Sequence, residues 1–258
     1  MMPAGASKVL GRIENAGIRF DKVEVGKVDS TLVYAMTFGN KSATPLLLIH
    51  GSPGDWSAWE NIIMNDSIRE SYFIIAVDRP GYGNTTVEAK QSLADQSKAI
   101  WSVIAYLELD KKIVVAGHSY GGAVAEQLLV EGDSLFSQAV LVASTSSPEL
   151  MKPRWYNKLA NWILIDKMLS EELKSSNYEM LGLTSSLASL EPSLNSITTP
   201  IIFILGEEDI LVPFETADYF KKTKSTGVKF ILIEDLNHFI PWSDPDLITD
   251  VLLNKSNY

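Results

Sequence analysis

The chain has 258 residues, of which 46% are hydrophobic and 21% charged, a composition typical of a globular protein with a sizeable core. Its formal net charge of -10 argues against nucleic acid and membrane partners, because phosphate backbones and anionic lipids would repel it. The absence of cysteine excludes thiol catalysis, disulfides and thiolate metal sites.

The N-terminal residues 1–8 lack the apolar core of a signal peptide, so we expect a cytoplasmic protein, although a leader removed earlier would leave no trace. No apolar run approaches the length of a membrane span. The first nineteen residues have no clear pattern, and the composition leaves the oligomeric state open.

Apolar runs typical of strands alternate along the chain with segments of helical spacing. Strands are expected at 20–25, 31–38, 45–49, 73–77, 113–116, 139–142, 201–205 and 228–233. Helices are expected at 92–109, 121–130, 216–222 and 246–253. Several strands are continuous runs of β-branched residues or leucine, as in strands buried on both faces. The alternation predicts an α/β fold with a parallel sheet between two layers of helices.

The stretch 144–197 interrupts this alternation, because it contains no convincing strand. It carries Trp155 and Trp162 among polar residues. A connection of this length is typical of an insertion or a lid. We therefore expect a small helical cap at 144–197 over the carboxyl edge of the sheet, on a core made of 20–143 and 198–258.

The sequence Gly117-His118-Ser119-Tyr120-Gly121 lies between an apolar run and a run of small residues. A strand that ends on Gly-x-Ser-x-Gly and leads into a helix is the setting of a nucleophile elbow. The turn is so sharp that side chains two positions before and after the serine would collide, which favours glycine at both. We predict that Ser119 is a nucleophile at a helix N-terminus, where backbone N–H groups favour negative charge.

A serine nucleophile needs a base, and the chain has three histidines. His118 adjoins Ser119, so its ring should point away from the hydroxyl. His50 precedes a Gly/Pro-rich loop and is expected to be a hydrogen-bonded structural residue. His238 follows the last apolar run, in a loop at a strand's carboxyl end, where α/β sheets present catalytic groups. His238 is therefore the predicted base.

The base in turn needs an acid that fixes its tautomer. Glu207, Glu208 and Asp209 all directly follow the strand at 201–205, and their composition does not choose between them. Asp235 is so near His238 along the chain that its short side chain would rarely reach the far ring nitrogen. With an acid from the 207–209 group, the chain order is serine, acid, histidine.

Acyl transfer also needs N–H donors for the oxyanion. The Tyr120 N–H, at the start of a helix, is one candidate. The second should come from the loop His50-Gly51-Ser52-Pro53-Gly54, which follows an early strand. Since Pro53 has no N–H, the Ser52 N–H is the better candidate.

Three further features complete the sequence pattern. The turn at 78–83 is expected to be structural, with Arg79 paired to a carboxylate beneath the site. The candidate walls of an apolar substrate pocket are Phe239, Trp155 and Trp162. The histidines lack zinc-site spacing and no Gly-x-Gly-x-x-Gly motif opens a strand–helix unit, so neither a metal nor an organic cofactor is expected.

Together these motifs resemble the α/β-hydrolase superfamily over residues 31–253. The resemblance is carried by 50–54, 78–83, 117–122, 206–209 with Pro213, and 237–239. It implies an eight-stranded, mostly parallel sheet with a cap inserted after the sixth strand. It also implies that Ser119 is the nucleophile, His238 the base, Asp209 the acid, and Ser52 and Tyr120 the oxyanion donors. Among the three neighbouring acids, Glu208 is our fallback for Asp209.

Departures from related families narrow the expected reaction. Haloalkane dehalogenases and epoxide hydrolases use aspartate where this chain has Ser119. Proline iminopeptidases differ at Ser52, His118 and Tyr120, and carbon–carbon bond hydrolases often have asparagine at the position of His118. We expect a serine hydrolase whose partner is a small-molecule ester, thioester or lactone. Two alternatives stay open: a carbon–carbon bond hydrolase using the same residues, and a catalytically silent ligand-binding protein.

Overall fold

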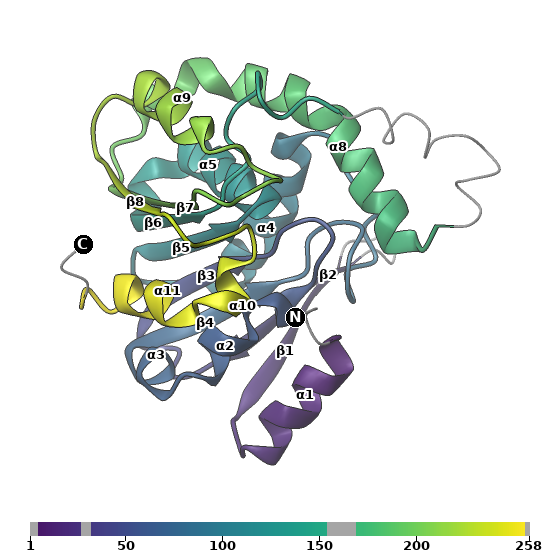
Figure 1. Ribbon diagram of the computed structural model, residues 1–258. Coiled ribbons are helices and arrows are strands. Elements are labelled where there is room, and N and C mark those ends of the chain that lie inside the picture. Colours follow the sequence, from purple (N-terminus) through teal and green to yellow (C-terminus); the bar gives the residue numbers. More distant parts are fainter. Residues whose placement is uncertain (1–4, 27–31, 154–168, 256–258) are drawn as a thin grey trace.

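The computed structural model describes residues 5–26, 32–153 and 169–255. Its centre is an eight-stranded sheet with the order β1-β2-β4-β3-β5-β6-β7-β8 (Figure 1). The strands are β1 (Phe20–Gly26), β2 (Leu32–Phe38), β3 (Thr44–Ile49), β4 (Tyr72–Val77), β5 (Ile113–His118), β6 (Phe136–Val142), β7 (Ile201–Gly206) and β8 (Val228–Ile233). β2 runs antiparallel to β1 and β4, and all other neighbours are parallel. The predicted fold class is confirmed.

Helices cover both faces of this sheet. The described helices are α1 (Ala6–Asn15), α2 (Glu60–Met64), α3 (Asp66–Ser71), α4 (Leu93–Leu107), α5 (Tyr120–Gly132), α8 (Glu171–Leu190), α9 (Glu215–Thr223), α10 (Ile240–Ser243) and α11 (Pro245–Leu252). Three short 3-10 helices are η1 (Trp56–Trp59), η2 (Asp133–Leu135) and η3 (Glu191–Ser196). None of the helices within the described ranges is long and apolar enough to cross a membrane.

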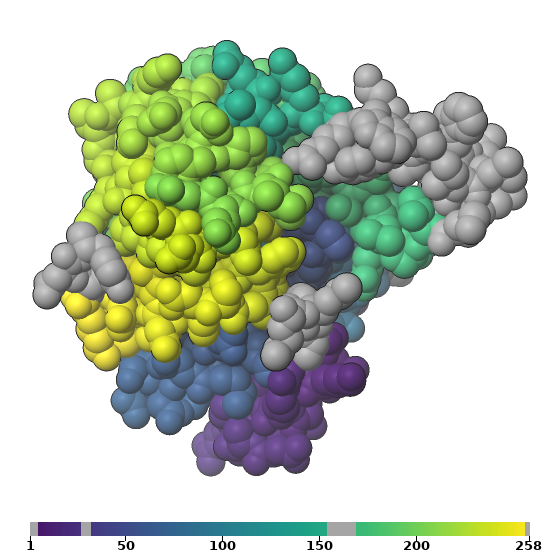
Figure 2. All heavy atoms as spheres, viewed as in Figure 1, coloured from purple at the N-terminus to yellow at the C-terminus, as the bar shows by residue number. Residues whose placement is uncertain are grey.

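The central strands are apolar throughout because each face of the sheet contacts its own layer of helices. Along β3, Leu47 and Ile49 pack into the core beneath α4, α5, α8 and α9. Leu46 and Leu48 point the other way, into the core beneath α1, α2, α3, α10 and α11. On the latter side the C-terminal residues, yellow in Figure 2, adjoin the blue segment that contains α2 and α3. This alternation along buried strands is the period expected of a pleated sheet.

The structure adds short elements that the sequence pattern did not predict. Helix α1 lies within the N-terminal stretch that had no clear pattern; its buried face consists of Val9 and Ile13, one helical turn apart. Between β3 and β4 the chain forms η1, α2 and α3, which are too short to show a helical period. In the described part of 144–197 the chain forms α8 and η3 and no strand.

Candidate active site

Ser119 lies at the turn between β5 and α5, with φ 55° and ψ -122°. A non-glycine residue in this region is strained and persists only where its surroundings hold it. A Cβ on Gly117 would lie 2.4 Å from the carbonyl oxygen of Gly121. A Cβ on Gly121 would lie 2.4 Å from the carbonyl oxygen of His50. The two glycines therefore permit a turn that larger residues would block.

The strand order brings Ser119 and the loops after β3, β6, β7 and β8 together at the carboxyl edge of the sheet. Ser52, Ser119 and His238 line one cavity of about 230 Å³. Its apolar wall consists of Leu150, Met151, Met180, Leu183, Leu211 and Val212. Two of these residues, Met180 and Leu183, belong to α8, so this helix forms part of the cavity wall. Hydroxyl side chains and Lys152 line the rest of the cavity, so it suits a small ligand with both apolar and polar parts.

His238 and Asp209, which are 29 positions apart, are in direct contact. The Nδ1 atom of His238 lies 2.7 Å from Oδ2 of Asp209. The other carboxylate oxygen, Oδ1, accepts hydrogen bonds of 2.8 Å from the N–H groups of Leu211 and Val212. Because both side chains are buried, these contacts fix the plane of the imidazole and direct Nε2 away from the carboxylate.

The neighbouring carboxylates lie elsewhere. Glu207, Glu208 and Asp235 are all exposed, whereas Asp209 is buried and turned toward His238.

The Ser119 hydroxyl and the His238 ring line the same cavity without forming a hydrogen bond to each other. Such bonds are often long in ligand-free sites and shorten when substrate binds.

His118 has a role that sequence reasoning did not identify. Its Nε2–H donates to the carbonyl oxygen of His238 at 2.9 Å, and its ring lies 4.9 Å from the His238 ring. Burial lowers the pKa of His118 to about 3, so the ring stays neutral. Although it points away from the Ser119 hydroxyl, as expected, His118 anchors the main chain of the predicted base. Its place beside the serine was the only signal in the sequence.

The loop after β3 lies against Ser119, since a Cβ on Gly51 would lie 3.1 Å from Cβ of Ser119. The Ser52–Pro53 peptide bond in this loop is cis. Tyr120 is the first residue of α5, so its N–H belongs to the first turn, where the helix supplies no acceptor. The two predicted oxyanion donors therefore lie on adjacent segments beside Ser119.

A buried ion pair joins α8 to this loop. Arg79, which follows β4, contacts Glu179 of α8 at 2.6 Å, and both side chains are fully buried. Arg79 also donates to the carbonyl oxygens of His50 and Gly51 at 3.0 and 2.8 Å. Burial alone would lower the pKa of Arg79, but the charge of Glu179 holds it above its ordinary value. Arg79 thus connects the loop after β3 to the helix above it.

Hydroxyl groups continue this network to the cavity wall. The Tyr82 hydroxyl donates to Glu179 at 2.8 Å and lies 2.8 Å from Oγ of Ser52. Ser52 Oγ donates to Oγ of Ser176 on α8 at 3.0 Å. His50 is enclosed here: its Nδ1–H donates to the Gly51 carbonyl, and its Nε2 accepts from the Arg79 N–H. Burial lowers the pKa of His50 well below its ordinary value, so it is a neutral structural residue.

The predicted aromatic walls are not among the residues that line the cavity. Phe239 is 47% exposed and packs edge-on against the His238 ring and beside Trp242. The chain turns at Asn237, whose side chain accepts from the Phe239 N–H. Phe239 thus lies against the outer side of the His238 ring and not in the cavity wall. Trp155 and Trp162 lie outside the described residues. Aliphatic and methionine side chains from 150–151, α8 and the loop after β7 line the cavity instead.

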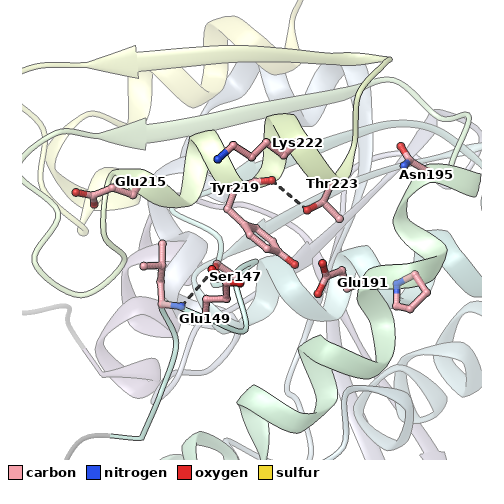
Figure 3. A pocket seen from close by; sticks show the side chains of 10 residues that line it. Ser147, Glu149, Glu191, Asn195, Glu215, Tyr219, Lys222 and Thr223 are labelled. Atoms are coloured by element: carbon pink, nitrogen blue, oxygen red, sulfur yellow. Dashed lines mark hydrogen bonds between the residues drawn. The ribbon is translucent and has the colours of Figure 1, made fainter.

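A second, larger hollow of about 610 Å³ lies beside α9 (Figure 3). It is lined by Glu149, Glu191, Glu215 and Lys222, together with Tyr219 and polar neighbours. It contains no nucleophile paired with a histidine among its lining residues. Over the described ranges, no group of three or more His, Asp or Glu side chains is arranged to hold a metal ion.

Comparison with known proteins places the chain in a large group of relatives. The chain is 26% identical to the uncharacterized hydrolase YugF of Bacillus subtilis, over 86% of its own length and 93% of YugF. It is 26% identical to a pimeloyl-[acyl-carrier protein] methyl ester esterase of Legionella pneumophila, over 81% and 93% of the two chains.

The fold itself has a close counterpart among solved structures. An esterase from Exiguobacterium antarcticum superposes with a TM-score of 0.72 at 21% identity, covering 91% of this chain and 99% of the esterase. Residues 46–251 also match the sequence profile of the alpha/beta hydrolase family. The chain therefore belongs to the alpha/beta hydrolase family.

Proposed function

We propose that the protein is a serine hydrolase that cleaves a small carboxylic ester, or a related thioester or lactone, through an acyl-enzyme on Ser119. One observation carries this proposal: His238, held by the buried Asp209, lines the same small cavity as a strained serine at a helix N-terminus. The similarity to an enzyme named as a methyl ester esterase supports ester cleavage.

In the proposed reaction, Ser119 Oγ attacks the ester carbonyl carbon and its proton passes to Nε2 of His238. Asp209 stabilises the resulting imidazolium through its contact with Nδ1. The negative oxygen of the tetrahedral intermediate accepts hydrogen bonds from the N–H groups of Ser52 and Tyr120. The C–O bond then breaks, and His238 gives its proton to the departing alcohol. Water, deprotonated by His238, hydrolyses the acyl-enzyme and releases the acid and the free serine.

We also infer that 144–197 acts as a cap. Helix α8 supplies Ser176, Met180 and Leu183 to the cavity, and its Glu179 is tied to Arg79 of the core. Water is excluded from a covered cavity, which strengthens the electrostatic interactions that stabilise an oxyanion.

A panel of p-nitrophenyl esters whose acyl chains lengthen from two to twelve carbons in steps of two tests the proposal. We expect hydrolysis that peaks at short chains and falls by about a million-fold in kcat when Ser119→Ala is introduced. Retention of activity in that variant would reject Ser119 as the nucleophile. Absence of turnover on every ester would favour the carbon–carbon hydrolase alternative if Ser119 still reacts with a fluorophosphonate. It would favour the ligand-binding alternative if Ser119 does not react.

A further inference from the structure

Thr145 has a buried hydroxyl that has no hydrogen-bond partner among the described residues. The residue is 4% exposed and lines the same cavity as Ser119 and His238. Its N–H donates to the carbonyl oxygen of Ser119 at 3.3 Å, so its backbone is held directly beside the nucleophile. A buried hydroxyl without a partner is costly, and at a residue that lines a binding cavity a ligand can supply the missing partner.

The chain on either side of Thr145 is anchored in the opposite direction. Ser144 and Ser146 both donate to Oε1 of Glu126, a fully buried residue of α5. These two bonds turn the flanking side chains toward the helix and leave the threonine between them at the cavity wall. The backbone of Thr145 is therefore held in place by the protein before any ligand binds.

Apart from Ser119, the other hydroxyls of the cavity are already engaged. Ser52 and Ser176 bond to each other, and the remaining wall is mainly apolar. Since β5 lies between β3 and β6, the loops that carry Ser52 and Thr145 flank Ser119 on opposite sides. In the tetrahedral intermediate, the reacting carbon carries the Ser119 oxygen, the oxyanion, the departing oxygen and the acyl chain. With the oxyanion bound at Ser52 and Tyr120, the departing oxygen and the acyl chain remain to be placed. The departing oxygen must face His238, which protonates it, so the acyl chain is the substituent left for Thr145.

We propose that Thr145 determines acyl specificity by hydrogen-bonding an oxygen on the substrate's acyl chain, close to the reacting carbonyl. The inference rests on the proposed function and names its substrate class: short esters whose acyl part carries a hydroxy, alkoxy or oxo group. A site built to bond such an oxygen discriminates against a hydrocarbon chain of the same shape, because the hydrocarbon leaves the buried hydroxyl unpaired.

The test compares p-nitrophenyl methoxyacetate with p-nitrophenyl butyrate, which differ by one ether oxygen in place of a methylene group. The ratio of their kcat/KM values is measured in the wild type and in Thr145→Val, so the intrinsic reactivity of each ester cancels. We expect Thr145→Val to lower the ratio by about tenfold and Thr145→Ser, which keeps the hydroxyl, to stay within about twofold of the wild type.

Thr216→Val is the matched control. Thr216 is also fully buried with a hydroxyl that has no partner in the described part of the chain, but it lies on α9 and does not line the cavity. This variant should leave the ratio unchanged. An unchanged ratio in Thr145→Val, with Ser119→Ala inactive on both esters, would overturn this inference and leave the proposed function standing. Hydrolysis by Ser119→Ala would instead overturn the proposed function.

Discussion

Two hollows share Leu150 as a wall and differ in nearly everything else. The larger, of about 610 Å³, carries exposed charges such as Glu149, Glu215 and Lys222. The smaller, of about 230 Å³, holds Ser119 and His238, both buried, with His238 held by a buried aspartate. Volume and charge thus fail to identify the candidate site. Fixed orientation identifies it, because chemistry requires groups whose positions are set in advance.

The largest expected effect tests whether orientation of His238 matters. Asp209→Asn replaces the carboxylate oxygen opposite Nδ1 and destabilises the imidazolium, so kcat on the preferred ester should fall by about ten-thousand-fold. Glu215→Gln, in the larger hollow, should leave kcat unchanged because its side chain is exposed and does not line the cavity of Ser119. If Glu208→Gln rather than Asp209→Asn abolished turnover, the fallback acid would be the correct one.

The next effect concerns the ion pair that ties α8 to the loop after β3. Glu179→Ala leaves the fully buried guanidinium of Arg79 without its counter-charge, which should lower the free energy of unfolding by about 3–5 kcal/mol. Glu171→Ala removes a pair with Lys174 on the same helix, where the Glu171 side chain is 87% exposed, and should cost about 1 kcal/mol or less. Urea unfolding measures both, and equal costs would show that burial of the pair is irrelevant.

The smallest effect depends on pH. Burial raises the pKa of Glu126 from 4.5 to about 7, so the folded protein keeps a proton that the unfolded chain loses. The stability that this proton contributes is present below pH 4.5 and is lost as pH rises through about 7. Glu126→Gln stays neutral, so its unfolding free energy relative to the wild type should rise by on the order of 3 kcal/mol between pH 4.5 and 8.

Chemical unfolding of both proteins across that range gives the comparison directly. Asp78, whose pKa burial also raises to about 7, contributes to both proteins and cancels in the difference. A difference that does not change with pH would mean that Glu126 is ionised or protonated equally in the folded and unfolded states.

The sheet could be predicted from the sequence because its strands are buried on both faces and therefore appear as uninterrupted apolar runs. The elbow could be predicted because only glycine fits around the Ser119 turn. The choice among Glu207, Glu208 and Asp209 needed the resemblance, since the residue types are chemically equivalent. In the structure these three carboxylates differ in burial.

Other parts of the site gave no sequence signal. Glu179 lies 100 positions from Arg79, in a stretch without strand pattern, and a single acidic residue there is indistinguishable from a solvated one. Thr145 lies in a short polar run, and only the contacts of Ser144 and Ser146 with Glu126 distinguish it from its neighbours as the residue that lines the cavity. Both features depend on long-range packing, which local periodicity cannot encode.

The central claim is that Ser119 is a nucleophile activated by its surroundings. Labelling with a fluorophosphonate, followed by proteolysis and mass spectrometry, tests it most directly. The adduct should lie on Ser119 and form in the native protein. It should not form when the protein is heat-denatured before labelling, nor in Asp209→Asn. An adduct on another residue, or hydrolysis of the ester panel by a protein whose Ser119 stays unlabelled, would contradict the account.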